Sequence, residues 1–427
     1  MNKPLLIALL CFFTTQLCAQ NINTIINSKE VQRIETALSS DEMQGRKTFT
    51  PGIEEAAEFI STEFKKTGLQ TFNKAPGYRQ SFFMLKPSVI STSCILNGQP
   101  VSSSQIIVIT SKKDISFKQA EGFEQVIIGQ NENLFSKAQE LLQSGKDCIA
   151  FVDTSFAKNF SRLVFFKKQV QPTTGSVVFV LTNLVPKEYT VEAKHSFDTL
   201  RLSNVVGVLP GKSKPDEYVI FSGHYDHLGI GKPINGDSLY NGANDDAAGI
   251  TAVIMLAKYF KALNNNARTI IFTTFTAEEI GGFGSQYFSK HLDSSKVMAM
   301  FNIEMIGTES KWGANSAYVT GYEKSDMGSI LQKNLKGSAF TFYPDPYTEE
   351  NLFYRSDNAA LARMGVPAHT ISTSKMDDEP NYHKPSDEIG TLNMTNMAEI
   401  IKAIALSSKG IISGKETPSR VDTTQLK

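Results

Sequence analysis

The chain has 427 residues, more than one typical domain, and its 41% hydrophobic and 20% charged content is ordinary for a globular protein with a sizeable core. Lys plus Arg and Asp plus Glu both number 43, so the formal net charge is zero. This balance excludes the strong positive field on which nucleic-acid binding and attraction to anionic membranes depend. We therefore expect no nucleic-acid partner.

Residues 1–19 have the pattern of a secretory signal peptide. Lys3 supplies a positive charge, residues 5–13 form an apolar segment too short to span a bilayer, and residues 17–19 offer a cleavage site. No later segment is long and apolar enough to be a membrane span. We expect an exported protein, periplasmic or extracellular, and the alternative is a lipid anchor at Cys18.

Residues 20–87 begin with helical patterns. Apolar residues recur at helical spacing from Ile22 to Leu38, and Ile53 to Thr67 carries its apolar residues on one face. Gly68 supplies the C-terminal stop signal of the second helix. A polar loop, Asp41 to Gly52, separates the two segments.

The character of the chain changes over residues 88–203. Short β-like runs appear at 105–110, 124–128, 148–152 and 176–181, with one helical segment at 132–142. This pattern predicts an inserted, smaller, β-rich domain without chemistry of its own. We expect His195 at its surface. Cys94 and Cys148 both lie here, and the sequence permits either a disulfide or two buried thiols.

Strands and helices alternate regularly from residue 204 onward. The strands are expected at 204–209, 219–223, 269–275, 297–303, 317–320 and 368–373. The helices are expected at 248–263, 283–291, 327–335, 358–364 and 395–412. Such alternation predicts an α/β fold, with a mostly parallel mixed sheet flanked by helices on both faces. Residues 204–413 form the predicted catalytic domain, and 414–427 a C-terminal tail.

Imidazole and carboxylate side chains occur where these strands end, the edge at which open α/β sheets bind ligands. Five of them can hold two zinc ions, with one carboxylate bridging: His224, Asp245, Glu279, Glu304 and His383. Glu278 is not needed as a ligand, which places it as general base. We expect Asp226 and Asp387 to hold the ligands in position rather than bind metal, because a ligating imidazole commonly donates its other N–H to a carboxylate, as His224 could to Asp226. We also expect a supporting role for His227. The role of residues 354–357 stays open.

Several segments resemble the co-catalytic di-zinc aminopeptidase family, whose relatives include glutamate carboxypeptidases, glutaminyl cyclases and the transferrin receptor ectodomain. The motifs SGHYDHLG, NGANDDAAG, TAEEIGGFGS, NIEMIG and NYHKPSD occur in the family's order, and DEMQGR and YRSDNAALARMGVPA are also similar. The resemblance covers roughly residues 28–78 and 204–412. Five motifs in order make it highly specific.

The resemblance implies a zinc-peptidase fold with two Zn²⁺ per chain, and it assigns residues 20–87 to the catalytic domain and 88–203 to a protease-associated insert. It makes His224 and His383 the zinc histidines and Asp245 the bridge, with a cis Asp245–Asp246 peptide. Glu279 and Glu304 become the terminal carboxylate ligands and Glu278 the base. Many family members carry Asp where this chain has Glu304.

The implied function is an exported zinc-dependent aminopeptidase that hydrolyses N-terminal residues from peptides, using a water activated by two metals. A glutaminyl cyclase is the first alternative, but cyclases lack the first histidine ligand and His224 is present. A carboxypeptidase needs a basic pocket for the substrate carboxylate, which the sequence leaves open. A non-catalytic binding ectodomain needs no metal ligands. Side-chain preference and oligomeric state do not follow from the sequence.

Overall fold

The computed structural model describes residues 21–426 except residues 120, 169 and 173–174. The predicted signal peptide and Cys18 lie outside the described residues. The chain divides into two compact units, one from Met1–Gln80 with Asn204–Lys427 and the other from Ser81–Ser203. In the part of the chain that the structure describes, no helix has the length and apolarity needed to cross a bilayer.

The first unit is built on a mixed sheet whose strands are ordered β16-β15-β17-β14-β10-β13-β9. Pairing is parallel between β10 and both β13 and β14, and between β14 and β17, whereas β9 is antiparallel to β13. The strands are β9 (Tyr189–Leu209), β10 (Lys214–His224), β13 (Arg268–Phe275), β14 (Val297–Ile303), β15 (Ser316–Val319), β16 (Thr341–Pro344) and β17 (Ala368–Ser372). The short β1 (Gln70–Thr71) pairs with β9.

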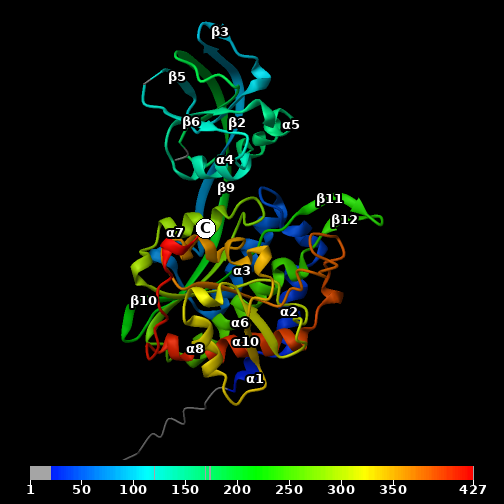
Figure 1. Cartoon of the computed structure of the whole chain (residues 1–427). Coiled ribbons are helices and arrows are strands. Elements are labelled where there is room, and N and C mark those ends of the chain that lie inside the picture. The colour runs from blue at the N-terminus through cyan, green and yellow to red at the C-terminus, as the bar shows by residue number, and fades with distance from the viewer. Residues whose placement is uncertain (1–20, 120, 169, 173–174, 427) are drawn as a thin grey trace, which may run out of the picture. The chain divides into compact units, whose positions relative to one another are not determined.

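Helices cover both faces of this sheet because successive strand residues point to opposite sides (Figure 1). On one face Phe221 of β10 stacks on Phe260 of α6 (Ala248–Leu263), 5.6 Å between ring centroids. On the other, Phe275 of β13 meets Phe288 of α7 (Phe283–Lys290) at 5.5 Å. The remaining helices are α1 (Ile22–Ile25), α2 (Ser28–Leu38), α3 (Pro51–Thr67), α8 (Met327–Asn334), α9 (Asn358–Ala362), α10 (Met394–Ser407) and α11 (Lys409–Ile412). The predicted fold class is confirmed.

Local sequence accounts for the ends of α3. Pro51 occupies the first turn, where a missing N–H costs nothing, and Gly68 closes the helix with φ +76°. The helix α6 differs, because its first ten residues are all buried and mostly apolar. A helix that is apolar all round belongs inside a core. It therefore fixes the loop that precedes it against the sheet.

The second unit contains a four-stranded sheet ordered β4 (Ile106–Ile109), β8 (Val177–Leu181), β7 (Cys148–Val152), β6 (Glu124–Ile128). Side chains of α4 (Leu134–Gln143) and α5 (Ala157–Phe160) pack on one face. The other face packs against β2 (Arg79–Leu96), β5 (Asp114–Lys118) and the first half of β9, and β3 (Gln99–Pro100) pairs with β2. Cys94 and Cys148 are buried free thiols. That this unit is a protease-associated domain stays a prediction.

The prediction that His195 lies at the surface is wrong. Its side chain is buried and its ring stacks on Phe197. The reason is the first half of β9, which the sequence reading missed: Val191, Ala193 and His195 alternate inward along the strand.

The residues predicted as a C-terminal tail pack on the first unit as far as they are described. Arg268 Nη1 donates to the carbonyl of Glu416, and Arg420 Nη1 donates to the carbonyl of Val297 at 2.8 Å. Arg268 is buried and Arg420 is exposed, and both hold the segment by hydrogen bonds to backbone carbonyls, so the segment 414–426 is part of the folded unit.

Candidate metal centre

Three neighbouring parallel strands bring the candidate ligands to one edge of the sheet. His224 is the last residue of β10, Glu279 follows β13, and Glu304 follows β14 directly. Since β10 lies between β13 and β14, the carboxyl ends of all three meet there. Asp245 comes from the loop between β12 (Asp237–Tyr240) and α6. His383 comes from the loop between β17 and α10. The β12 strand pairs with β11 (Gly229–Ile234) in a separate hairpin.

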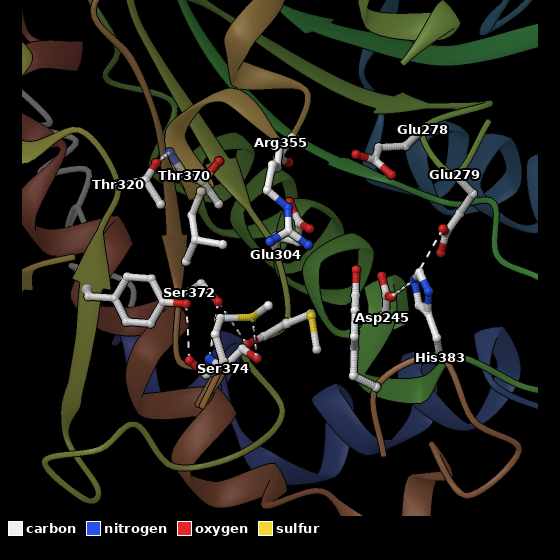
Figure 2. Close-up of a pocket in the computed structure, with 16 residues that line it drawn as sticks. Asp245, Glu278, Glu279, Glu304, Thr320, Arg355, Thr370, Ser372, Ser374 and His383 are labelled. Carbon is white, nitrogen blue, oxygen red and sulfur yellow. Dashed lines mark hydrogen bonds and ion pairs between the residues drawn. The ribbon is translucent and has the colours of Figure 1, made fainter. Parts of the chain in front are cut away.

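Asp245 lies between the two predicted zinc histidines. Its Oδ1 is 3.2 Å from His224 Nε2, and its Oδ2 is 3.2 Å from His383 Nε2. His383 Nε2 is also 3.3 Å from Glu279 Oε2 (Figure 2). Ligand atoms of His224, Asp245 and Glu304 all lie within 4.8 Å of one another. The structure therefore brings all five predicted ligands together, and Glu278 lines the same cavity.

A second histidine of the HYDHLG motif belongs to this cluster. His227 is buried, and its Nδ1 lies 2.8 Å from Glu279 Oε1 and 3.8 Å from Asp245 Oδ2. It forms a further group with Asp245 and Glu279 whose ligand atoms lie within 4.8 Å of one another. Its position three residues after His224 was the sequence signal, and we expected a supporting role there.

The electrostatic potential in the cavity favours the binding of a positive charge. Burial raises the pKa of both Glu278 and Glu304 above the ordinary range. Burial also opposes protonation of His383, yet its hydrogen bonds to Asp245 and Glu279 raise its pKa to about 10. Glu304 Oε2 is buried and accepts no hydrogen bond from the described residues. A buried carboxylate oxygen that lacks a hydrogen-bond partner, and that lies among other nitrogen and oxygen ligand atoms, suits a zinc ion.

Asp226 supports the site differently from the prediction. We expected its carboxylate to accept from the imidazole of His224, but His224 Nδ1 lies 3.0 Å from the Asp226 backbone carbonyl and 3.8 Å from the carboxylate. The carboxylate instead accepts the backbone N–H groups of Glu278 at 3.0 Å and Glu279 at 3.3 Å. Asp226 thus orients His224 through its backbone carbonyl, and it orients Glu278 and Glu279 through its carboxylate.

Asp246 is a positioning residue that the sequence reading missed. Its carboxylate accepts the backbone N–H groups of His224 at 3.1 Å and Met305 at 3.0 Å, so it ties two strand ends together. The peptide Asp245–Asp246 is cis, as the resemblance implied. A Cβ on Gly249 would lie 2.4 Å from the Asp246 carboxylate oxygens, so only glycine permits this approach.

Arg46 of the DEMQGR motif was also missed. Its guanidinium is fully buried and donates to the backbone carbonyls of Leu38, Tyr225, Asn241, Gly242 and Asp245. Tyr225 directly follows His224, and Asp245 is the candidate bridging carboxylate. One side chain therefore joins the early loop to both ligand-bearing segments.

The cavity extends beyond the ligands. One wall carries the hydroxyl groups of Thr320, Thr370, Ser372 and Ser374, on β17 or beside it (Figure 2). Tyr382 lines the cavity with its ring stacked on His383, 3.9 Å between centroids. Within the run 354–357, whose role the sequence left open, Arg355 and Ser356 line the cavity.

Residues 204–407 match the family model of peptidase family M28. They are a peptidase family M28 domain. The family resemblance seen in the motifs is confirmed, and the ligand-bearing loops of this M28 domain all lie inside the matched range.

Curated relatives of the M28 domain are similar over parts of their length. A probable zinc metalloprotease of Pyricularia oryzae is 34% identical over 113 residues, 26% of this chain and 22% of that protein. Aminopeptidase YwaD of Bacillus subtilis is 29% identical over 211 residues, 48% of this chain and 43% of that protein. The chain therefore spans less than half the length of either relative. These matches support an enzyme of the zinc metallopeptidase class.

A solved structure shares the fold over most of the chain. The aminopeptidase from Aneurinibacillus sp. strain AM-1 has a TM-score of 0.56 and 16% identity, covering 95% of this chain and 99% of that one. At this identity the likeness concerns the fold alone. The roles of individual residues rest on the geometry of the site.

Proposed function

We propose that the protein is an exported zinc-dependent aminopeptidase that removes N-terminal residues from peptides. The observation that carries the proposal is Asp245, whose two carboxylate oxygens each lie 3.2 Å from a different histidine, His224 and His383. A carboxylate shared in this way suits a pair of cations. The M28 match supports the enzyme class, and the signal-peptide pattern of residues 1–19 supports export.

Each ion has its own set of ligands in this proposal. His224 and Glu304 would hold one, His383 and Glu279 the other, and Asp245 would bridge them. Bound zinc supplies Lewis acidity, which lowers the pKa of a water and polarises a carbonyl. The Asp226 carboxylate accepts the backbone N–H of Glu279, and His227 Nδ1 contacts the Glu279 carboxylate. Together these two contacts would keep the Glu279 side chain oriented toward its ion.

Glu278 acts as general base. It lines the cavity but belongs to neither ligand set, and burial raises its pKa above the ordinary range of a carboxyl group, which makes it a better proton acceptor. Its carboxylate takes the proton of the attacking water and later delivers it to the leaving amine. The Asp226 carboxylate fixes the backbone N–H of Glu278 at 3.0 Å and so limits how far the base can move.

The free α-amine of the substrate would lie near the ion that His224 and Glu304 hold, where its nitrogen can interact with the cation. An N-blocked peptide lacks this interaction. This distinguishes an aminopeptidase from a carboxypeptidase on the same scaffold. A glutaminyl cyclase is disfavoured because His224 is present among the ligands.

The test is hydrolysis by the zinc-loaded full chain of aminoacyl p-nitroanilides, N-blocked peptides and N-blocked peptides with a C-terminal glutamate. Cleavage confined to free N-termini supports the proposal, and cleavage of N-blocked peptides from their C-terminus replaces it with a carboxypeptidase. E278Q should retain zinc while kcat falls roughly 10²–10⁴-fold. Near-normal turnover by E278Q would refute the base assignment.

A further inference from the structure

Arg355 is the sole Lys or Arg side chain among the described residues that line the cavity. Figure 2 shows its side chain extending into the cavity, between the ligand carboxylates on one side and the hydroxyl groups of Thr320, Thr370 and Ser372 on the other. A guanidinium group presents several N–H donors in one plane, and two of them can bind the two oxygens of a carboxylate.

Its partner in the protein does not neutralise it. Arg355 Nη1 lies 2.9 Å from Glu350 Oε2, with the two side chains 43% and 50% exposed. An ion pair this exposed contributes little to stability, because water screens it, so Glu350 is easily exchanged for another carboxylate. Nε and Nη2 of Arg355 have no hydrogen-bond partner within the described ranges, which leaves them available to a ligand.

The four carboxylates that line the cavity already have roles of their own. Under the proposed function, on which this inference rests, Asp245, Glu279 and Glu304 are ligands and Glu278 is the base. Two divalent cations offset these four carboxylates. The guanidinium of Arg355, paired only with the exposed Glu350, then remains as the positive charge of the cavity wall, and it attracts an anionic group of the substrate.

The opposite wall supports the same conclusion. Thr370 Oγ1 accepts from Asn302 and donates to Asn358, so its hydroxyl is already fixed, and Ser374 Oγ donates to Glu379 at 3.3 Å. These hydroxyl groups are held by protein partners, so this wall is polar but carries no positive charge that would compete with Arg355 for an anion.

We propose that Arg355 is the specificity-determining residue of this site and that it binds a carboxylate of the substrate. Two sources of that carboxylate have the same chemistry: the side chain of an acidic N-terminal residue, and the C-terminus of a dipeptide. Either source selects short or acidic peptides over neutral, extended ones.

The experiment uses the zinc-loaded full chain and two substrate pairs that differ by one charge. Glu-p-nitroanilide against Gln-p-nitroanilide tests the side chain, and Ala-Ala against Ala-Ala-amide tests the C-terminus. The ratio of kcat/KM within each pair is measured for the wild type, R355Q, R355K and E350Q. Calorimetric binding of free glutamate and free glutamine to the same proteins gives a readout independent of turnover.

We expect the wild type to prefer the charged member of one pair and R355Q to reduce that preference tenfold or more. R355K should retain part of it, because it keeps the charge but not the fork. E350Q, which removes only the exposed partner, should keep or increase it. No preference in either pair, or ratios unchanged by R355Q, would overturn the inference. If no substrate is cleaved, the proposed function fails. Calorimetric binding to the wild type and R355Q still decides the role of Arg355, with glutamate against glutamine for the side chain and Ala-Ala against Ala-Ala-amide for the C-terminus.

Discussion

The carboxylate of Asp387 holds the backbone that carries Asp245. Its Oδ2 accepts the N–H of Asp245 at 3.0 Å and its Oδ1 accepts the N–H of Asn244 at 2.8 Å. Asp387 lies in the same loop as His383, four residues further along the chain. The proposed bridging residue Asp245 and the proposed ligand His383 are therefore fixed to each other by the Asp387 side chain.

Replacing Asp387 with Asn tests this link. The amide offers one oxygen where the carboxylate offers two, so one buried N–H loses its partner, at a cost of about 1–3 kcal/mol. We expect D387N to bind zinc roughly 10–100-fold more weakly, measured by competition with a chromogenic chelator. D378N, an exposed acid nearby, is the matched control. Equal zinc affinity in D387N and the wild type would contradict the link.

Arg46 allows a prediction about stability. Five backbone carbonyls surround its guanidinium, and a lysine has only three donors on one nitrogen and no fork. R46K should lower the free energy of unfolding by about 3 kcal/mol or more, because buried carbonyls are left without donors. Denaturant unfolding measures this, with R363K at an exposed position as the control. A change of less than about 0.5 kcal/mol in R46K would refute it.

The sequence predicted the elements that are buried on all sides. Residues 248–263 and 297–303 begin and end where expected, because continuous apolar runs flanked by polar residues have clear limits. The strands β2 and β9 were largely missed, since 79–96 and 189–203 are half exposed and rich in polar residues. Strand pairing in the three-dimensional fold, and not local apolarity, makes them strands.

The candidate ligands could be picked out because imidazole and carboxylate side chains stand at the ends of predicted strands, and the structure brings these residues together. The residues that hold these candidate ligands in position could not be predicted. Arg46 and Asp246 act on backbone N–H and carbonyl groups, which every residue carries, so no pattern of side chains reveals the partner. The carbonyl of Tyr225 is 179 positions from Arg46 in the sequence. Only the fold brings such groups together.

His369 makes stability depend on pH. It is fully buried, with Nδ1 2.8 Å from the Thr320 carbonyl and Nε2 2.6 Å from Ser325 Oγ. Burial lowers its pKa from 6.5 to about 4. Between these values the unfolded chain binds a proton that the folded chain does not, so stability is lost as pH falls from 6.5 toward 4, by about 3 kcal/mol.

H369Q removes this titration. We expect the loss of unfolding free energy between pH 7 and pH 4.5 to be smaller in H369Q than in the wild type, whatever the variant's stability at pH 7. Denaturant unfolding at several pH values measures the slope. H291Q, at an exposed position, serves as the control and should keep the wild-type slope. An H369Q slope equal to that of the wild type would show that another group causes the acid instability.

Metal removal should destabilise the first unit. Asp245, Glu278, Glu279 and Glu304 line one cavity, and like charges this close repel when no cation lies between them. Zinc that binds only the folded chain stabilises it by about 4 kcal/mol at a free concentration a thousand times Kd. We expect chelation to lower the Tm and added zinc to restore it. A Tm insensitive to both treatments would argue against any metal centre here.

The number of ions bound by single variants tests whether Asp245 is shared. If His224 with Glu304 and His383 with Glu279 each hold their own ion, E304Q and E279Q should each retain about one zinc per chain, because each loses a ligand from one set only. D245N should lose both, since each set needs an oxygen of that carboxylate. Elemental analysis after dialysis against a weak chelator gives the counts, with D378N as the control. Retention of two ions by D245N would exclude a shared carboxylate, and loss of both ions by E279Q would mean that the two sets do not fill independently.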